Sequence, residues 1–355
     1  MNKLKKVISG LCLLFVIFEI SGCSRDEIIY PSLEVNTSKG AYVLCEGGFS
    51  IGTSMLSFYN KTSDSLYNNI FNPGSLGLLP DGMIINDNSL FIVEQGNFGS
   101  SGKLYKTDTN GIQLASVNVG TNPYSLTAAF GKIFITNGPA NNVSVVDKNT
   151  FAVLGNIGVG VYPQEILAIG NNVFVCNTSE FGGATDSTVS VINAQSNTVI
   201  ATIQVRKTPS ALAISEDGKL LVGCPGDSIS AAIFKIDPLT FNKIDSFTNL
   251  KYGLAKDISA LTSQYIVYIG GNVYSEEGII KYDMSNRISE EIIPKPLTGL
   301  NYCLAADYDE NVIYVGYIPS FSASGKLQIY NLSGSLQKNL NIAGGIAPRR
   351  IVVKR

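Results

Sequence analysis

Histidine and tryptophan are absent from the 355 residues of this chain, and charged residues make up only 15% of it. Without histidine there is no Ser-His-Asp or Cys-His machinery, no histidine general base and no histidine metal ligand. The net charge of −2 provides no basic footprint for nucleic acid. Hydrophobic residues reach 45% and there are 35 glycines, which excludes a disordered tail or a charged coiled coil.

The N-terminus has the pattern of a secretory signal, with lysines before an apolar run from Val7 to Phe18. The run is too short for a membrane-spanning helix. It ends in Ile20-Ser21-Gly22-Cys23, which resembles a bacterial lipobox, whose cysteine is cleaved and lipidated. The alternative is an ordinary signal peptide that happens to contain Cys23. We therefore expect a signal peptide over 1–22, a lipid-anchored tether over 23–39 and a folded domain over 40–355.

A lipid on Cys23 would anchor the protein to a membrane without spanning it. Ser24 is not the aspartate that retains many lipoproteins in the inner membrane. The following pair, Asp26-Glu27, resembles the surface-export signal of Bacteroidota lipoproteins. We expect an outer-membrane protein exposed at the cell surface, with the lipid as its only membrane contact. Without residues 1–22 the chain has 23 basic and 27 acidic residues, which argues against direct binding to anionic lipid.

A repeat of 40–47 residues organises the rest of the chain, and each unit has four short β-rich runs separated by turn residues. The first run of the unit begins at Pro80, Pro123, Pro163, Pro209, Ala255, Asn301 and Pro348. Four strands at this period predict a β-propeller of seven blades. The last unit has only a first strand, Pro348–Lys354, and the N-terminal unit lacks one. We therefore expect Pro348–Lys354 to pair with Ala41–Glu46 and close the ring.

Two features of the repeat predict structural roles for polar and sulfur side chains. The third run of every unit ends in Asp or Asn, which is typical of side chains that bond to their own turn. Cys45, Cys176, Cys224 and Cys303 fall in different units with no CxxC spacing. We expect them to be buried free thiols rather than disulfides or metal ligands.

Residues 130–224 resemble the YVTN-type, YncE-like propellers, through stretches such as Ile133-Phe-Ile-Thr-Asn, Asn142-Val-Ser-Val-Val-Asp and Pro209-Ser-Ala-Leu-Ala-Ile. The start of the domain, Gly40-Ala-Tyr-Val-Leu-Cys-Glu-Gly-Gly-Phe, resembles Bacteroidota surface lipoproteins with such propellers. Some of these capture corrinoids and pass them to a TonB-dependent transporter. Others have no assigned ligand. The resemblance implies a capture or scaffold lipoprotein, and it only suggests a corrinoid as the ligand and such a transporter as the partner.

Two sets of residues are candidates for a ligand site on the face where functional propeller loops gather. Long second-to-third-strand loops each carry an aromatic residue: Phe49, Phe98, Phe181, Tyr274 and Phe321. The starts of the first strands carry polar residues and tyrosines: Asp81, Tyr124, Gln164 with Glu165, Lys256 with Asp257, Tyr302, and Arg349 with Arg350. The alternatives are aromatics that pack on their own blades and charges that pair within the ring.

A third set stands at the ends of the second strands: Glu46, Glu94, Asn137 and Asn177. Their combination resembles the carboxylate-amide metal site of propeller lactonases, and oxygen ligands of this kind suit Ca²⁺. The alternative is hydrogen bonding to loop backbones.

These observations favour a lipid-anchored propeller that binds a ligand, uses no cofactor and catalyses nothing. The rival hypotheses are a metal-dependent, lactonase-like hydrolase and a scaffold or adhesion module for another surface protein.

Overall fold

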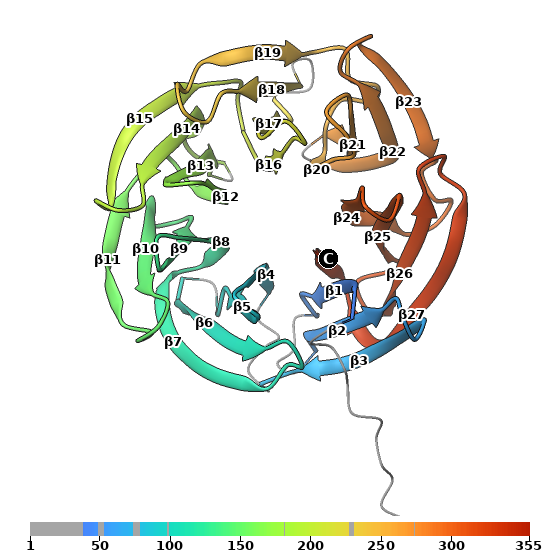
Figure 1. Cartoon of the computed structure of the whole chain (residues 1–355), viewed down its shortest axis with the longest axis horizontal. Helices are drawn as coiled ribbons and strands as arrows, with labels where there is room; N and C mark the ends of the chain where they lie inside the picture. Colours follow the sequence, from blue (N-terminus) through green and yellow to red (C-terminus); the bar gives the residue numbers. More distant parts are fainter. Residues whose placement is uncertain are drawn as a thin grey trace, which may run out of the picture. The chain divides into compact units, whose positions relative to one another are not determined.

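The computed structural model describes residues 38–48, 53–73, 79–97, 99–180, 182–226, 231–272 and 274–355. A compact unit, Glu34–Arg355, contains 28 strands in seven four-stranded antiparallel sheets. The sheets stand like blades around a central axis, so the chain is an all-β, seven-bladed propeller (Figure 1). We call the region along this axis the channel. Within the described residues, no helix is long and apolar enough to cross a membrane.

The seven blades follow one another along the chain, except that the first is built from both ends. Blade 1 consists of β28 (Pro348–Lys354), β1 (Gly40–Cys45), β2 (Met55–Asn60) and β3 (Ser65–Phe71). Blade 2 consists of β4 (Pro80–Asn86), β5 (Ser89–Glu94), β6 (Ser101–Asp108) and β7 (Gln113–Thr121). Blade 3 consists of β8 (Pro123–Ala129), β9 (Lys132–Asn137), β10 (Asn142–Asp147) and β11 (Val153–Gly158).

The remaining blades repeat this order from the channel outward. Blade 4 consists of β12 (Pro163–Ile169), β13 (Asn172–Ser179), β14 (Thr185–Asn193) and β15 (Thr198–Gln204). Blade 5 consists of β16 (Ala211–Ile214), β17 (Leu220–Cys224), β18 (Ala232–Ile236) and β19 (Lys243–Phe247). Blade 6 consists of β20 (Lys256–Ala260), β21 (Tyr265–Asn272), β22 (Ser275–Asp283) and β23 (Ile288–Ile293). Blade 7 consists of β24 (Leu300–Asp307), β25 (Val312–Ile318), β26 (Ser324–Asn331) and β27 (Leu336–Ile346).

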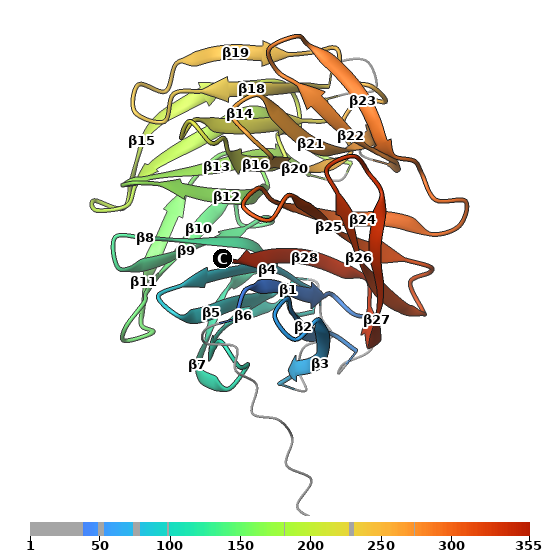
Figure 2. The same cartoon turned by 45° about the vertical axis from the view of Figure 1, so that its right-hand side comes forward.

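The predicted closure of the ring is confirmed. Strand β28 pairs with β1 in an antiparallel ladder that runs from Gly40 opposite Lys354 to Cys45 opposite Pro348 (Figure 2). The last strand thereby becomes the innermost strand of the first blade. This pairing removes the two sheet edges that an open array would leave exposed.

The hydrophobic core lies between neighbouring blades, where alternate side chains of adjacent sheets interdigitate. Between blades 4 and 5, for example, Phe174 and Val191 are buried with Val222 and Ile236. Four cysteines are buried in such layers as free thiols, as predicted: Cys45, Cys176, Cys224 and Cys303. Burial raises the pKa of the Cys303 thiol to about 12, so it stays protonated at neutral pH.

The Asx residues at the ends of the third strands act as turn residues, again as predicted. Asp147, for example, accepts hydrogen bonds from the backbone amides of Asn149 and Thr150. The same pattern of a side-chain oxygen bonding the amides two and three or four residues later recurs at Asn60, Asp108, Asn193, Asp237, Asp283 and Asn331. The recurrence is local turn chemistry, repeated once per blade.

Candidate functional site at the mouth of the channel

A β-bulge interrupts the start of six of the seven innermost strands. In β4 the pairing jumps between Pro80 and Gly82, in β20 between Lys256 and Ile258, and β8, β12, β24 and β28 show the same shift. The residues released from the ladders are Asp81, Tyr124 with Ser125, Gln164 with Glu165, Asp257, Tyr302 and Arg349. A bulge re-aims side chains, and here it gathers charged and phenolic groups from six blades around the channel.

The two arginines of β28 link the blades through ion pairs. Arg349 places its Nε 3.2 Å from an oxygen of Asp81, and its Nη2 donates to the Tyr124 hydroxyl at 2.6 Å. Arg350 reaches Asp81 at 3.0 Å and Glu165 at 2.6 Å. These links join blade 1 to blades 2, 3 and 4. The intra-ring pairing that the sequence left as an alternative is therefore present.

Burial and charge together set the protonation of this network. Burial alone would lower the pKa of Arg350, but the carboxylates of Glu165 and Asp81 outweigh it and hold the pKa above its ordinary value. Burial raises the pKa of Tyr124 and of Tyr302, and the carboxylate of Glu46 raises that of Tyr302 further. Both phenols therefore stay protonated at neutral pH and act as hydrogen-bond donors or acceptors, not as bases.

A cavity of about 330 Å³, which we call the mouth chamber, opens beside these residues. Its walls combine first-strand starts with two loops, and they are Glu46, Gly47, Gly48, Leu79, Asp81, Gln95, Tyr124, Tyr302, Phe321 and Arg349. Five residues predicted for ligand binding thus share one cavity: Asp81, Tyr124, Tyr302, Phe321 and Arg349. Glu46, predicted as a metal-ligand alternative, lines the same cavity.

One wall of the mouth chamber is an aromatic cluster with a carboxylate behind it. The rings of Tyr302 and Phe321 meet edge to face, with centroids 5.7 Å apart. The Tyr302 hydroxyl donates to Glu46 at 2.9 Å. The Lys256 ammonium stands 3.7 Å from the centroid of the Tyr302 ring and pairs with Glu276 at 2.8 Å. The tyrosine is therefore held in place by contacts on its hydroxyl, its edge and its face.

The Glu46 carboxyl is the titratable group of this wall. Burial raises its pKa above the ordinary value, in spite of the opposing charge of Arg349. In the part of the chain that the structure describes, Glu46 has no ion pair, whereas the carboxylate of Asp81 has two. The chamber therefore offers an apolar, aromatic surface with a few convergent polar groups, which is typical of small-molecule sites.

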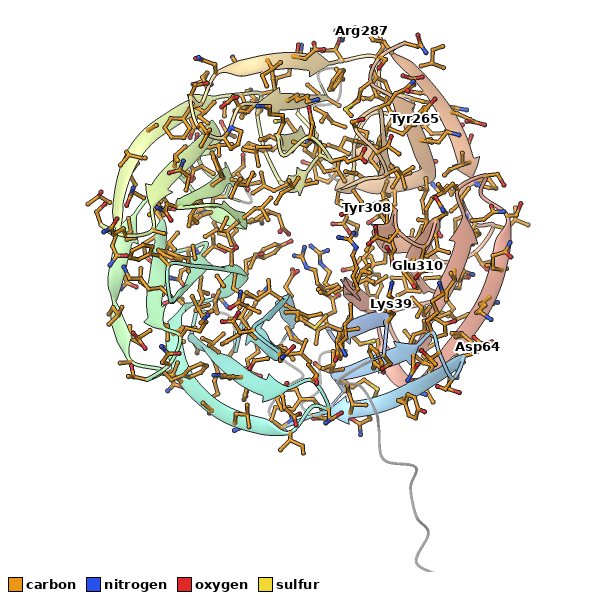
Figure 3. All side chains as sticks on the ribbon, viewed as in Figure 1. Lys39, Asp64, Tyr265, Arg287, Tyr308 and Glu310 are labelled. Atoms are coloured by element: carbon orange, nitrogen blue, oxygen red, sulfur yellow. The ribbon has the colours of Figure 1, made fainter. Side chains whose placement is uncertain are left out.

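A second cavity, of about 520 Å³, lies further along the inner strands. Its lining includes Arg350, Glu165 and Asp257, followed by residues of β16, β20 and β24. The consecutive residues Arg349 and Arg350 therefore each reach a different cavity. Figure 3 shows the side chains that project from the inner strands, with Tyr308, just after β24, labelled near the channel.

Three predicted binding residues lie outside the mouth chamber. Lys256 does not line the chamber, and its ammonium contacts the ring of Tyr302 instead. Tyr274 is 86% exposed and contacts no wall of the chamber. Gln164 accepts a hydrogen bond from Thr136 through its backbone carbonyl and is absent from the lining. Phe49, Phe98, Phe181 and the predicted lipidation site Cys23 lie outside the described residues.

The other members of the predicted carboxylate-amide set are bonded within their own blades. Glu94 accepts from Tyr105 at 3.1 Å, Asn137 donates to Ser144 and Asn177 donates to Ser190. Asn177 also accepts from the backbone amide of Gly160, as the alternative required. Among the described residues, no group of three or more Cys, Asp and Glu side chains is placed to hold a metal ion. Within the described residues, Glu94 Oε2 and Asn137 Oδ1 have no hydrogen-bond partner, so the carboxylate-amide alternative stays a prediction.

Leu79 and Gln95 line the mouth chamber but were not predicted. Leu79 has a φ of 59°. The residues before the four other repeated prolines also have a positive φ: Asn122, Tyr162, Thr208 and Ala347. This left-handed step turns the chain from the outer strand of one blade into the inner strand of the next. The recurrence of a position directly before each repeated proline is the sequence signal that could have identified Leu79 as a candidate.

Comparisons with known proteins bear on the fold and the family. The family described as domain of unknown function (DUF5074) matches residues 39–344. A search of curated proteins finds no match. A quinonprotein alcohol dehydrogenase-like protein from Bacteroides thetaiotaomicron has a similar structure, with a TM-score of 0.67, 15% identity and coverage of 89% of this chain and 78% of that one.

Two further solved structures share the fold at low identity. A candidate 6-phosphogluconolactonase from Bacteroides fragilis matches with a TM-score of 0.64 and 12% identity, covering 90% of this chain and 99% of that one. Hydrazine synthase of Kuenenia stuttgartiensis matches with a TM-score of 0.58 and 17% identity, covering 71% and 76%. At such identities the likeness concerns the fold alone.

Proposed function

This chain belongs to the DUF5074 family, and we propose that it is a non-catalytic binding protein whose ligand occupies the mouth chamber of the propeller. The observation that carries the proposal is the convergence of Asp81, Tyr124, Tyr302, Phe321 and Arg349 on one cavity of about 330 Å³. The bulges aim Asp81, Tyr124, Tyr302 and Arg349. Arg349 holds Asp81 in place through an ion pair and Tyr124 through a hydrogen bond. Such a preorganised site loses little conformational entropy when a ligand binds.

The chemistry of the chamber supports binding rather than catalysis. Asp81 and Arg349 neutralise each other, and the phenols of Tyr124 and Tyr302 remain protonated. The aromatic rings that line the chamber supply contact area at low entropy cost. Glu46 and Gln95 supply polar groups that can orient a ligand through hydrogen bonds. We infer a partly apolar ligand with a few polar groups.

A corrinoid is the first ligand to test, because the N-terminal residues of the domain resemble corrinoid-capturing lipoproteins. The volume of the chamber stands at the lower end of the range for ligand pockets, roughly 300–1,000 Å³. A corrinoid would therefore insert only one edge and lie mostly across the loops. Calorimetric titration with cyanocobalamin tests this directly. No heat and no rise in melting temperature would remove the corrinoid and leave the chamber open to other ligands.

We also propose that the protein is displayed on the outer membrane by a lipid on Cys23 and hands its ligand to a TonB-dependent transporter. Cys23→Ala should release the protein from the membrane fraction, because the lipid supplies the membrane affinity. Retention of this variant in the outer membrane after signal cleavage would contradict the anchoring. Co-purification of the transporter with the wild-type protein tests the partnership.

The binding proposal is tested with a thermal-shift screen of corrinoids, haem and glycans, followed by titration of each compound that stabilises the protein. Phe321→Ala is a suitable variant because Phe321 is 52% exposed, so its loss should not unfold the domain. Tyr274→Ala is the matched control, since it removes an exposed loop aromatic outside the chamber. Equal affinities of the wild type and Phe321→Ala would move the site elsewhere.

A further inference from the structure

A groove of about 490 Å³ runs between blades 6 and 7, and its lining shares no residue with the mouth chamber. One side is the connection after β23, residues 294–298. The other side is one face of β26, where Lys326, Gln328 and Tyr330 project in alternation, together with Tyr317 of β25. Asn301, at the start of β24, forms part of the same lining.

Asn301 is the unusual residue of this groove. It is only 2% exposed, yet its side-chain Nδ2 has no hydrogen-bond partner among the residues that the structure describes. Five other blades have proline at the equivalent position, so the fold does not require an amide here. An unpaired buried donor costs about 1–3 kcal/mol, and native proteins retain few of them. The amide donor therefore points to a ligand that supplies an acceptor.

Further donors line the same groove. Within the described residues, the Lys326 ammonium has no ion pair, and it stands 5.9 Å from the centroid of the Tyr317 ring. Gln328 accepts from the Tyr330 hydroxyl at 2.8 Å through its amide oxygen, so its NH₂ group is left with one long contact of 3.5 Å to Asn339. The lining holds two lysines and no acidic side chain; Lys295 pairs with Glu277 at 3.1 Å, which leaves Lys326 as the lysine available to a ligand.

We propose that this interblade groove is a second binding site, for an acidic sugar. The carboxylate of a uronate would pair with Lys326, and its hydroxyl oxygens would accept from Asn301 and Gln328. The C–H face of the ring would lie against Tyr317, because flat sugar faces are apolar. Hydrogen bonds that involve an ionised partner are about twice as strong as neutral ones, so the charged sugar is favoured over a neutral one.

Titration of the purified protein with trigalacturonic acid, and with maltotriose as the neutral match, tests the proposal. We expect trigalacturonic acid to bind at least tenfold more tightly, and salt to weaken its binding. Lys326→Gln should reduce the affinity about tenfold. Lys281→Gln is the matched control, because Lys281 also stands 5.8 Å from a tyrosine centroid but pairs with Glu290 outside the groove. No binding, or equal binding of the two sugars, would overturn the proposal.

Asn301→Leu separates a ligand role from a structural one. If the amide donor is unpaired in the free protein, a leucine of similar size should leave the melting temperature unchanged or higher. The same variant should bind trigalacturonic acid at least fivefold more weakly. A lower melting temperature with unchanged affinity would show that the amide serves the fold and would overturn the proposal. If the melting temperature and the affinity of Asn301→Leu both fall, the affinity of Lys326→Gln distinguishes the two roles, because the Lys326 side chain lies outside the core.

Discussion

The inner strand of blade 5 differs from the other six inner strands, and the difference explains where the site lies. Strand β16 pairs with β17 in unbroken register from Ala211 opposite Gly223 to Ile214 opposite Leu220. The other six inner strands begin with a bulge, and each bulge places a charged or phenolic side chain at the channel. Blade 5 contributes Ser210 and Ala211 at the same point. The bulge, rather than the strand, therefore builds the site.

Complete removal of one bulged strand should have the largest effect. Deletion of residues 346–355 takes away β28 with Arg349, Arg350 and the buried Ile351. Blade 1 would lose its innermost strand and the ring would open. We expect loss of cooperative unfolding, measured by circular dichroism and calorimetry. An unchanged melting temperature would refute the end-sealed topology.

Removal of a single bulge-linked charge should have the next largest effect. Arg350→Ala leaves Asp81 and Glu165 buried without this partner, and breaking a buried pair costs about 3–5 kcal/mol. Arg355→Ala is the control, because Arg355 is 42% exposed and its pairs with Asp307 and Asp309 should contribute no more than about 1 kcal/mol. Urea unfolding measures both. Similar losses of unfolding free energy for the two variants would show that the buried arginine network stabilises the ring no more than an exposed ion pair does.

Two serine variants, one in a bulged strand and one just before β16, compare the two kinds of strand directly. Ser125, in the bulge of β8, donates to Glu165 at 3.2 Å across to blade 4. Ser125→Ala should therefore cost about 1 kcal/mol of unfolding free energy. Ser210→Ala, just before β16, should stay within about 0.5 kcal/mol, since its side chain makes no such bond to any described residue. A greater loss at Ser210 would contradict the distinction between the two strands.

The smallest expected effect concerns the charge of Glu46 at different pH. Because burial raises its pKa in the folded protein above 4.5, folding favours the protonated form. Its contribution to stability is therefore greatest at low pH and is lost as the pH rises through the folded pKa. Glu46→Gln should be at least as stable as the wild type at pH 7 and lose this advantage near pH 4. Urea unfolding at both pH values measures this, and the same loss at both would point to packing instead.

Repetition made most of the fold predictable from sequence. The regular spacing of first strands from Pro80 to Pro348 predicts the number of blades. The N-terminal unit lacks a first strand before Ala41, and this predicts that the C-terminal strand closes the ring. The Asx residues at strand ends follow from local turn chemistry. The bulges were not predicted, because register depends on how neighbouring inner strands crowd together: a Cβ on Gly82 would stand 2.6 Å from Leu126. Sequence position alone could not place these side chains.

The candidate site was predicted in part for the same reason. The starts of the inner strands identified Asp81, Tyr124, Tyr302 and Arg349, because the repeat aligns them. The link between Arg350 and Glu165 spans 185 residues and depends on the closed ring. Tyr274 has the same loop pattern as Phe321, yet only Phe321 packs against a strand-start residue. Loop aromatics without a partner on the next strand therefore cannot be assigned from sequence.

The role of the bulged strands in binding is tested by the affinities of Tyr302→Ala and Tyr274→Ala for the compound that most stabilises the protein in the thermal-shift screen. Tyr302 lies in a bulge and in the mouth chamber, whereas Tyr274 is an exposed loop residue. Truncation of a central aromatic anchor costs about 2 kcal/mol or more, roughly a thirtyfold loss of affinity. We predict this loss for Tyr302→Ala and none for Tyr274→Ala. Equal affinities of the two variants would contradict a binding site built by the bulged strands.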